Sequence, residues 1–293
     1  MSHTHDNIKL GDSLKRRQFL RQASLAGVGL MFGADVLGKG AIFSTNNQPN
    51  PEAWDKSDFA RELGPYYELA HPGTIQTLQR KNWNAERWNI EVSGLSHKKG
   101  KYMLSDMVQS IGSEKRTMRI RGIERWSMEA EWTGFSLAAL ISKLKPASTA
   151  THVRFTSAMS PSDMVSDKDA NLPAVYSEAI RLDEAMHTLA FVATGINGQA
   201  LGAPNGGPVR LVLPWKYAHK SIMAINGIEF LDKEPTTFWQ ERNSDEYDFL
   251  GNVHPEQTHP RWSQQEEHRL FSNEHVDTLP FNGHQAQVAH LYV

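Results

Sequence analysis

Short runs of alternating or continuous apolar residues recur along most of the chain, and they predict β-strands. Residues 88–92 alternate apolar and polar positions and are followed by Ser93–Gly94, which is typical of a turn. Residues 209–213 lie between two prolines and are rich in apolar and β-branched side chains, which indicates a buried strand. Further strands are expected at 118–123, 152–155, 189–192 and 225–231.

Apolar residues at helical spacing are confined to a few short segments. One helix is expected to begin near Met107 behind a Ser105–Asp106 cap, or alternatively at Tyr102. The spacing also predicts helices over Phe135–Leu144 and Leu182–His187. Many strands with few, short helices favour an α+β fold with mixed sheets over repeated βαβ units.

Long segments of the chain show no regular pattern. Residues beyond Pro235 are rich in Trp, His and Glu and show little periodicity. Irregular segments between strands are where a ligand would be held. Residues 42–62 are polar and rich in Pro and Asn, so we expect a linker or arm there, followed by a single domain over 63–293.

The N-terminal residues 1–41 read as a targeting segment. Lys15 precedes the pair Arg16–Arg17, and Phe19–Leu20 follows in the arrangement expected of a twin-arginine signal. An apolar, Gly-containing run of about 15 residues comes next, shorter than the roughly 20 residues that span a bilayer. We therefore expect export to the periplasm by the twin-arginine (Tat) pathway, with the position of signal cleavage left open.

Composition narrows the function classes. Lys plus Arg is 31 and Asp plus Glu is 33, giving a net charge of −2, which offers no support for a nucleic-acid partner. The sequence contains no cysteine, which excludes disulfides, thiolate catalysis and thiolate metal ligands from these residues. No Walker loop, Gly-x-Ser-x-Gly or His-Glu-x-x-His motif is present, and His254 and His259 fit exposed or hydrogen-bonded loop histidines better than a metal pair.

Seven collinear blocks together resemble one protein family, the protein-methionine-sulfoxide reductase catalytic subunits of the sulfite oxidase superfamily. The blocks are Arg121–Met128, Trp132–Phe135, Leu182–His187, Asn205–Tyr217, Asp245–Tyr247, His259–Gln264 and Phe281–Gly283. They run from about residue 60 to the end of the chain, and a twin-arginine signal is also a feature of that family. The resemblance implies a sulfite-oxidase-type molybdopterin-binding fold.

The resemblance also implies a chemistry. In that family molybdenum sits on a pterin dithiolene, and a protein thiolate adds a further soft ligand that suits a redox metal. The metal takes the oxygen of methionine sulfoxide in oxidised periplasmic proteins. Electrons come from a haem-containing membrane partner. The protein holds and tunes the cofactor.

Several residues match family positions that contact the cofactor. Tyr67–Glu68 matches a pair that touches the pterin, and Asn205 and Arg210 match residues near the pterin and its phosphate. Arginine suits a phosphate because its planar guanidinium donates two parallel hydrogen bonds. Glu124 matches a carboxylate close to the metal, and we expect it to be catalytic. An ion pair on a strand is the structural alternative for Arg210, and a surface-loop carboxylate is the alternative for Glu124.

Other positions depart from the family pattern. Gly122 stands where the family has its metal-binding cysteine, so no protein metal ligand is expected there. Gly64 replaces an asparagine near the cofactor, and Ser157 replaces a threonine and keeps its hydroxyl. Ser221, Ile222 and Met223 fall where a Gly-x-Lys segment contacts the cofactor tail; Met223 removes a cation there, for which the adjacent His219–Lys220 offers a replacement.

Two functions remain open at the level of sequence. The first is a molybdopterin oxidoreductase in which water, hydroxide or Glu124 takes the place of the missing thiolate. The second is a pseudoenzyme that binds pterin, or a partner, without redox chemistry; a third, unrelated chemistry on the same fold is a further alternative. If the pocket is otherwise intact, Gly122→Cys should gain sulfoxide reductase activity.

Overall fold

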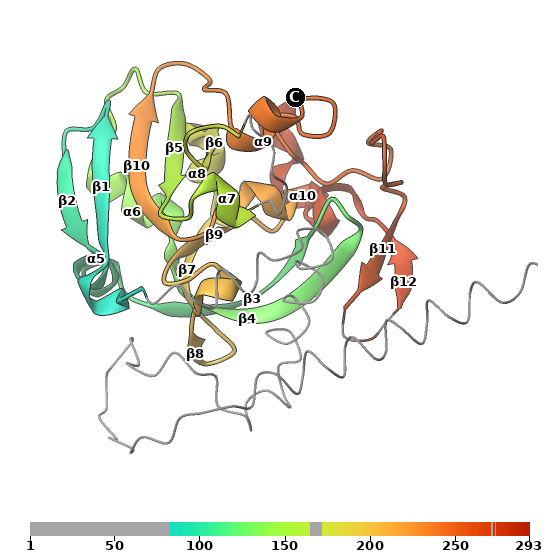
Figure 1. Ribbon diagram of the computed structural model, residues 1–293, viewed down its shortest axis with the longest axis horizontal. Helices are drawn as coiled ribbons and strands as arrows, with labels where there is room; N and C mark the ends of the chain where they lie inside the picture. Colours follow the sequence, from blue (N-terminus) through green and yellow to red (C-terminus); the bar gives the residue numbers. More distant parts are fainter. Residues whose placement is uncertain (1–82, 165–171, 271, 273) are drawn as a thin grey trace, which may run out of the picture. The chain divides into compact units, whose positions relative to one another are not determined.

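The computed structural model describes residues 83–164, 172–270, 272 and 274–293. The expected targeting segment, the arm, Gly64 and the pair Tyr67–Glu68 lie outside these residues. Within the described residues the chain forms two sheets connected by short helices and long irregular segments (Figure 1). The predicted α+β fold with mixed sheets is therefore confirmed.

The first sheet has five strands in the order β2-β1-β10-β5-β6. Strand β1 runs parallel to β10, whereas the other neighbours are antiparallel, so the sheet is mixed. The expected strands at 88–92, 152–155 and 225–231 all belong to it. Its bounds are β1 Asn89–Gly94, β2 Gly100–Met103, β5 His152–Ser157, β6 Ser177–Arg181 and β10 Ile225–Leu231.

The second sheet is built around the long strand β4, Trp126–Ser136. Strand β4 pairs with β3 and β7 in antiparallel fashion and with β11 in parallel fashion, which joins the middle of the chain to its C-terminal part (Figure 1). Its other strands are β3 Glu114–Arg121, β7 Phe191–Ile196, β8 Gln199–Ala200, β9 Arg210–Val212, β11 Glu266–Arg269 and β12 His275–Asp277.

The helices are short, and none of those described is long and apolar enough to cross a membrane. The α-helices are α5 Leu104–Ile111, α6 Leu137–Leu144, α7 Pro161–Met164, α8 Leu182–Ala185, α9 Phe238–Arg242 and α10 Gln285–Val288. Single 3-10 turns cover η1 Ala85–Arg87, η2 Ala203–Asn205, η3 Ala218–Lys220, η4 Pro280–Gly283 and η5 Ala289–Tyr292.

Two predicted helix starts are wrong in detail. Helix α5 begins at Leu104 behind Met103, because the Leu104 N–H donates to the carbonyl of Trp88 and no Ser105–Asp106 cap forms. Helix α6 begins at Leu137, because the two residues before it continue strand β4; the hydroxyl of Ser136 accepts from the N–H of Ala139 and caps the helix.

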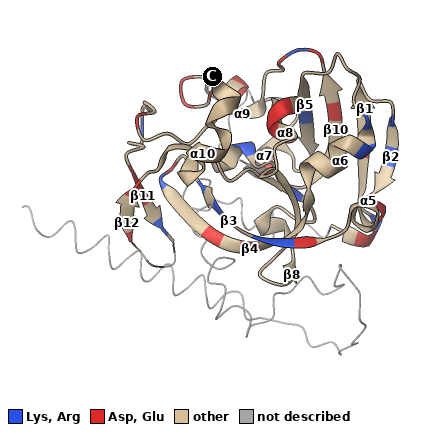
Figure 2. Ribbon diagram, turned by 180° about the vertical axis from the view of Figure 1, so that it is seen from behind, with Lys and Arg blue, Asp and Glu red and all other residues tan. Residues whose placement is uncertain are grey.

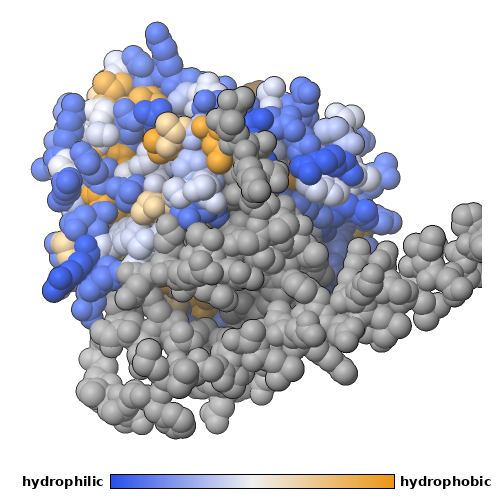
Figure 3. Space-filling view, viewed as in Figure 1, coloured by the Kyte–Doolittle hydropathy of each residue, from blue (hydrophilic) through white to orange (hydrophobic). Residues whose placement is uncertain are grey.

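A hydrophobic core lies between the first sheet and the helices that cover it. Helix α6 buries Leu137, Leu140, Ile141 and Leu144, a spacing that places all four on one face. Burying one such side chain stabilises the fold by about 2 kcal/mol. Lys, Arg, Asp and Glu occur at scattered positions on the strands and helices (Figure 2), and hydrophobic residues on the viewed face are scattered among hydrophilic ones (Figure 3).

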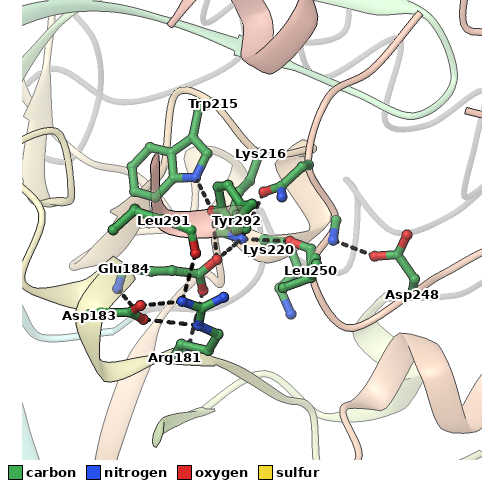
Figure 4. A network of polar contacts seen from close by, with 12 residues as sticks. Arg181, Asp183, Glu184, Trp215, Lys216, Lys220, Asp248, Leu250, Leu291 and Tyr292 are labelled. Carbon is green, nitrogen blue, oxygen red and sulfur yellow. Dashed lines mark hydrogen bonds and ion pairs between the residues drawn. The ribbon is translucent and has the colours of Figure 1, made fainter. Parts of the chain in front are cut away.

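The C-terminus is fastened to the core by a buried ionic network (Figure 4). The Nζ of Lys216 donates to Oε1 of Glu184 at 2.6 Å and to the carbonyl of Leu250 at 2.7 Å. The hydroxyl of Tyr292 donates to the same Glu184 oxygen at 2.6 Å and accepts from Nε1 of Trp215 at 2.8 Å. Burial lowers the pKa of Lys216 to about 8, although the Glu184 carboxylate opposes that shift.

Removing one member of this network should cost more than removing both charges together. We expect Lys216→Met to lower the free energy of unfolding by about 3–5 kcal/mol, because it leaves the Glu184 carboxylate buried without its cation. Lys216→Met/Glu184→Gln should recover part of that loss. Urea unfolding of the four chains in this cycle gives the coupling energy directly. If the double variant lost as much free energy of unfolding as Lys216→Met alone, Lys216 and Glu184 would not be a coupled pair.

Candidate functional site

The Gly122–Arg125 segment makes the tight turn between β3 and β4. The N–H of Arg125 donates to the carbonyl of Gly122 at 3.1 Å, and the N–H of Gly122 donates to the carbonyl of Trp126 at 2.8 Å. Arg125 takes a φ of 75°, a left-handed conformation that closes the turn. The backbone therefore holds Gly122, Glu124 and Trp126 close together at one end of the second sheet.

Arg121, the residue before this turn, is completely buried and tied to the C-terminal part of the chain. Its Nε lies 3.3 Å from Oε2 of Glu267, which is also completely buried. Its Nη2 donates to Oε1 of Gln264 at 3.2 Å and to Oγ1 of Thr278 at 3.3 Å, and its Nη1 donates to the carbonyl of Gly122. The Arg121 guanidinium thus connects the Gly122 turn to the C-terminal part of the chain.

The indole of Trp126 fills the space where residue 122 would carry a side chain. A Cβ built on Gly122 would lie 2.2 Å from both Cε2 and Nε1 of that indole and 2.8 Å from Oε2 of Glu124. Both separations are shorter than van der Waals contact, so glycine is required unless the ring moves. Trp126 itself is buried at 8% exposure against Met118 and Ile120 of the second sheet.

Glu124 presents a half-buried carboxyl beside Gly122. Its Oε2 accepts a hydrogen bond of 3.2 Å from Nε1 of Trp126. Burial raises the pKa of Glu124 above the usual range of a carboxyl, even though the Trp126 hydrogen bond and the charges of Arg121 and Arg261 act in the opposite direction. The carboxyl therefore keeps its proton at a higher pH than an exposed glutamate, which suits a general acid.

The structure brings the predicted pterin-side residues together in a second group. Asn205 ends η2, Arg210 begins β9, and the residues Ser221–Met223 follow η3. The Oγ of Ser157, the last residue of β5, donates to the carbonyl of Met223 at 2.6 Å. The side chain of Met223 lies on Gly206, where a Cβ would be 2.5 Å from its Cγ.

Most polar groups in this second cluster are already used inside the protein. Arg210 is 4% exposed and donates to the carbonyls of Leu211, Asn205 and Ser221. The Ser221 hydroxyl accepts from the N–H of Leu213. The exception is Oδ1 of Asn205, which is buried without a hydrogen-bond partner among the described residues. An orphaned acceptor of this kind fits a donor on a bound heterocycle.

The lysine next to Met223 is not available as a free cation. Lys220 is completely buried, and its Nζ lies 2.6 Å from Oε2 of Glu178, which is 1% exposed. Its ammonium also lies over the ring of Phe249, 4.7 Å from the centroid. Replacement of the missing cation by Lys220 would require this buried pair to open.

The sequence analysis missed an aromatic group near the Gly122 turn. Tyr247 packs edge-on against His219 at 5.0 Å between ring centroids, and Tyr217 stacks on His219 at 6.2 Å. The guanidinium of Arg121, the residue before the Gly122 turn, lies 5.9 Å from the centroid of the Tyr217 ring, which connects this aromatic group to the turn. The blocks that resembled the family included Tyr217 and Tyr247, but spacing along the chain carries no sign that they meet at one place.

Comparison with known proteins places this chain in a family. Residues 76–239 match the family model described as the oxidoreductase molybdopterin binding domain. The chain is 39% identical over 233 residues, 78% of this chain and 72% of the relative, to the protein-methionine-sulfoxide reductase catalytic subunit MsrP of Xanthomonas campestris pv. campestris. The chain belongs to this family. The suspected resemblance is thereby confirmed, and the protein is a molybdopterin-family oxidoreductase.

One further relative agrees with that assignment. The MsrP catalytic subunit of Campylobacter jejuni is 36% identical over 284 residues, which cover 95% of this chain and 94% of the relative. Among solved structures, the sulfane dehydrogenase SoxCD from Paracoccus pantotrophus matches 52% of this chain and 40% of its own with 15% identity and a TM-score of 0.44.

The family's cofactor fits the residues around Asn205, on the pterin side, but its metal does not fit the residues around Gly122. Asn205 offers an unpaired buried acceptor on the pterin side. Gly122 offers no ligand atom, the sequence has no cysteine, and no three His, Asp or Glu side chains gather as a metal site in the part of the chain that the structure describes. A molybdenum atom held through a cysteine thiolate is therefore incompatible with these residues.

Packing against Trp126 makes Gly122 sensitive to the smallest side chain. We expect Gly122→Ala to lower the free energy of unfolding by about 1–3 kcal/mol, because the new methyl group overlaps the indole. The double variant Gly122→Ala/Trp126→Leu should recover part of the lost free energy of unfolding, because the smaller side chain at 126 makes room for the methyl group. Gly202→Ala is the matched control, since a Cβ there would meet only Cδ of Pro204 at 3.7 Å. Thermal unfolding measures the stability of each variant. An equal loss of stability in Gly122→Ala and Gly202→Ala would contradict the clash with Trp126. By the same argument Gly122→Cys gains a usable thiolate only when Trp126 is also made smaller.

Proposed function

We propose that this protein reduces methionine sulfoxide in oxidised proteins, with molybdopterin as its cofactor. The observation that carries the proposal is the Glu124 carboxyl at the Gly122 turn, whose Oε2 accepts from Nε1 of Trp126 and whose pKa is raised by burial, in a member of the molybdopterin-binding family. The relatives of more than 35% identity are named for sulfoxide reduction in proteins. Their names motivate the substrate proposed for this chain.

The reaction requires proton delivery as well as electrons. Reduction of a sulfoxide breaks the S–O bond, consumes two electrons and two protons, and releases a thioether and water. The bound cofactor supplies the two-electron and oxygen-transfer chemistry. Because Oε2 of Glu124 accepts from the Trp126 indole, the carboxyl proton sits on Oε1 and is free to be donated to the departing oxygen. Trp126 thus orients the acid.

Molybdopterin would be held chiefly from the pterin side. Asn205 offers its orphaned Oδ1 as an acceptor, and the backbone around Ser221–Met223 is fixed by Arg210 and Ser157. We propose Tyr67 and Glu68 as additional contacts on the strength of the family resemblance. In this proposal the metal would have no protein thiolate, because position 122 is a glycine and Trp126 fills the space beside it.

Cofactor content tests this function. The full chain, produced with its N-terminal segment in a host supplied with molybdenum, should purify with molybdenum and pterin near one equivalent each and reduce methionine sulfoxide when given an artificial electron donor. Pterin without metal would instead indicate a redox-silent pterin-binding protein. A folded sample with neither would overturn the enzyme and leave an interaction role.

Glu124 should control the pH dependence of turnover. We expect kcat/KM to fall as the pH rises through the raised pKa of Glu124, because the carboxyl loses the proton that it must donate. Glu124→Gln should lower kcat by about 10²-fold or more and remove that limb of the profile. Glu129→Gln, an exposed position on β4, is the control and should change neither quantity. An unchanged pH profile in Glu124→Gln would exclude Glu124 as the acid.

The electron donor and the compartment are also proposals. The Arg16–Arg17 signal supports export by the Tat pathway to the periplasm, where a haem-containing membrane subunit would supply the electrons. Replacing both arginines with lysine should leave the protein in the cytoplasm, as cell fractionation followed by immunoblotting would show. Periplasmic protein in the Lys-Lys variant would contradict this route.

A further inference from the structure

His219 is the most unusual polar side chain near the Gly122 turn. Both of its ring nitrogens are buried, and neither has a hydrogen-bond partner among the described residues. A buried polar group without a partner costs stability, so such groups are few in folded proteins and mark places where a ligand completes the hydrogen bonds. The ring of His219 contacts those of Tyr217 and Tyr247.

A second histidine nearby shows the same feature. The Nδ1 of His259 accepts from the N–H groups of Arg261 and Trp262, both at 3.2 Å, which leaves the ring proton on Nε2. That Nε2 is buried without a hydrogen-bond partner in the described chain, and its nearest acid, Oε2 of Glu246, is 3.9 Å away. His259 therefore carries an N–H donor with no acceptor within reach.

These donors are uncharged. Burial lowers the pKa of His219 well below its usual value, and the charges of Lys220, Lys216 and His259 add to that effect. Burial also lowers the pKa of His259, and burial together with Glu124 raises that of Tyr247. Neutral imidazole groups thus lie among aromatic rings, His219 against Tyr217 and Tyr247 and His259 against Trp262.

We propose that His219, together with His259, binds the oxygen of the substrate's sulfoxide through neutral hydrogen-bond donors, while the surrounding rings, that of Tyr247 among them, contact its sulfur and carbon atoms. This inference rests on the proposed function and deepens it by naming the residues that bind substrate. A sulfoxide oxygen is a strong acceptor without a full charge, so neutral donors match it without the cost of burying an ion. Sulfur next to aromatic ring edges is a favourable contact.

The arrangement also explains selection against the product. A thioether has the same carbon substituents but no oxygen, so its binding would leave the N–H groups of His219 and His259 unpaired. A site built to hydrogen-bond one oxygen discriminates strongly against the analogue that lacks it. Product would therefore leave as soon as the oxygen has been removed.

Ring nitrogens can be observed directly, which separates binding from turnover. The full chain as purified, with ¹⁵N only in histidine, would be titrated with dimethyl sulfoxide and, in parallel, with dimethyl sulfide. We expect dimethyl sulfoxide to shift the ring ¹⁵N signals of His219 and His259, and dimethyl sulfide to leave them in place. Signals that do not move with dimethyl sulfoxide, or that move equally with both probes, would overturn the proposal.

A substitution provides the second readout. His219→Phe keeps an aromatic ring against the two tyrosines and removes both nitrogens, so it should leave thermal stability unchanged or improved while weakening dimethyl sulfoxide binding about 3- to 10-fold. The KM for methionine sulfoxide should rise by the same factor with kcat little changed. His97→Phe, at an exposed position, is the control. A lowered unfolding temperature with unchanged sulfoxide binding would show a structural role and overturn the inference.

These outcomes distinguish this inference from the proposed function. A protein that turns over methionine sulfoxide while its histidine signals ignore dimethyl sulfoxide keeps the function and loses the oxygen-binding role of His219. A protein without turnover whose His219 and His259 respond to dimethyl sulfoxide alone loses the catalytic proposal and retains the sulfoxide-binding site.

Discussion

The buried pair of Arg121 and Glu267 holds the site together. Each side chain is completely buried, so each would be expensive to leave unpaired, and Glu267 also accepts from Arg119 at 2.7 Å and from Ser127 at 3.1 Å. The pair fastens the end of β3 to β11, more than 140 residues further along the chain. Because the turn at Gly122 starts immediately after Arg121, this one contact decides where Glu124 and Trp126 can lie.

Packing at Gly122 then constrains the chemistry. The indole of Trp126 occupies the volume next to the backbone, and its N–H is directed to Glu124 rather than to solvent. Glycine and tryptophan at these two positions depend on each other, since any larger residue at 122 would displace the ring and the hydrogen bond that orients the acid. Glycine at position 122 is therefore part of a packing arrangement with Trp126, and we expect that a single substitution at 122 does not yield an accessible thiolate.

The sequence alone predicts the local elements better than the site. Strand β10 matches its expected range 225–231, and the strand at 88–92 agrees within two residues, because β-branched and alternating apolar residues specify them locally. Strand β4 was not predicted. Its residues Trp126, Met128, Ala130 and Trp132 alternate with polar or charged residues, which is the period-two pattern of a strand. The α6 start differs because sheet pairing extends β4 through Ser136, a long-range effect invisible to local spacing.

The site could not be predicted from the sequence, because the hydrogen-bond and ion-pair partners of its side chains come from distant parts of the chain. The residues Asn205, Arg210 and Ser221 lie together as the family resemblance implied, but only the fold shows that Arg210 is committed to backbone carbonyls and Lys220 to Glu178. With Arg210 hydrogen-bonded to carbonyls and Lys220 paired with Glu178, the unpaired buried groups that concern the proposed ligands are the Asn205 amide oxygen and the two imidazoles. An uncharged imidazole N–H suits a strong, uncharged acceptor, because no ion has to be buried with it. The neutral donors of His219 and His259 thus support a sulfoxide as the proposed ligand.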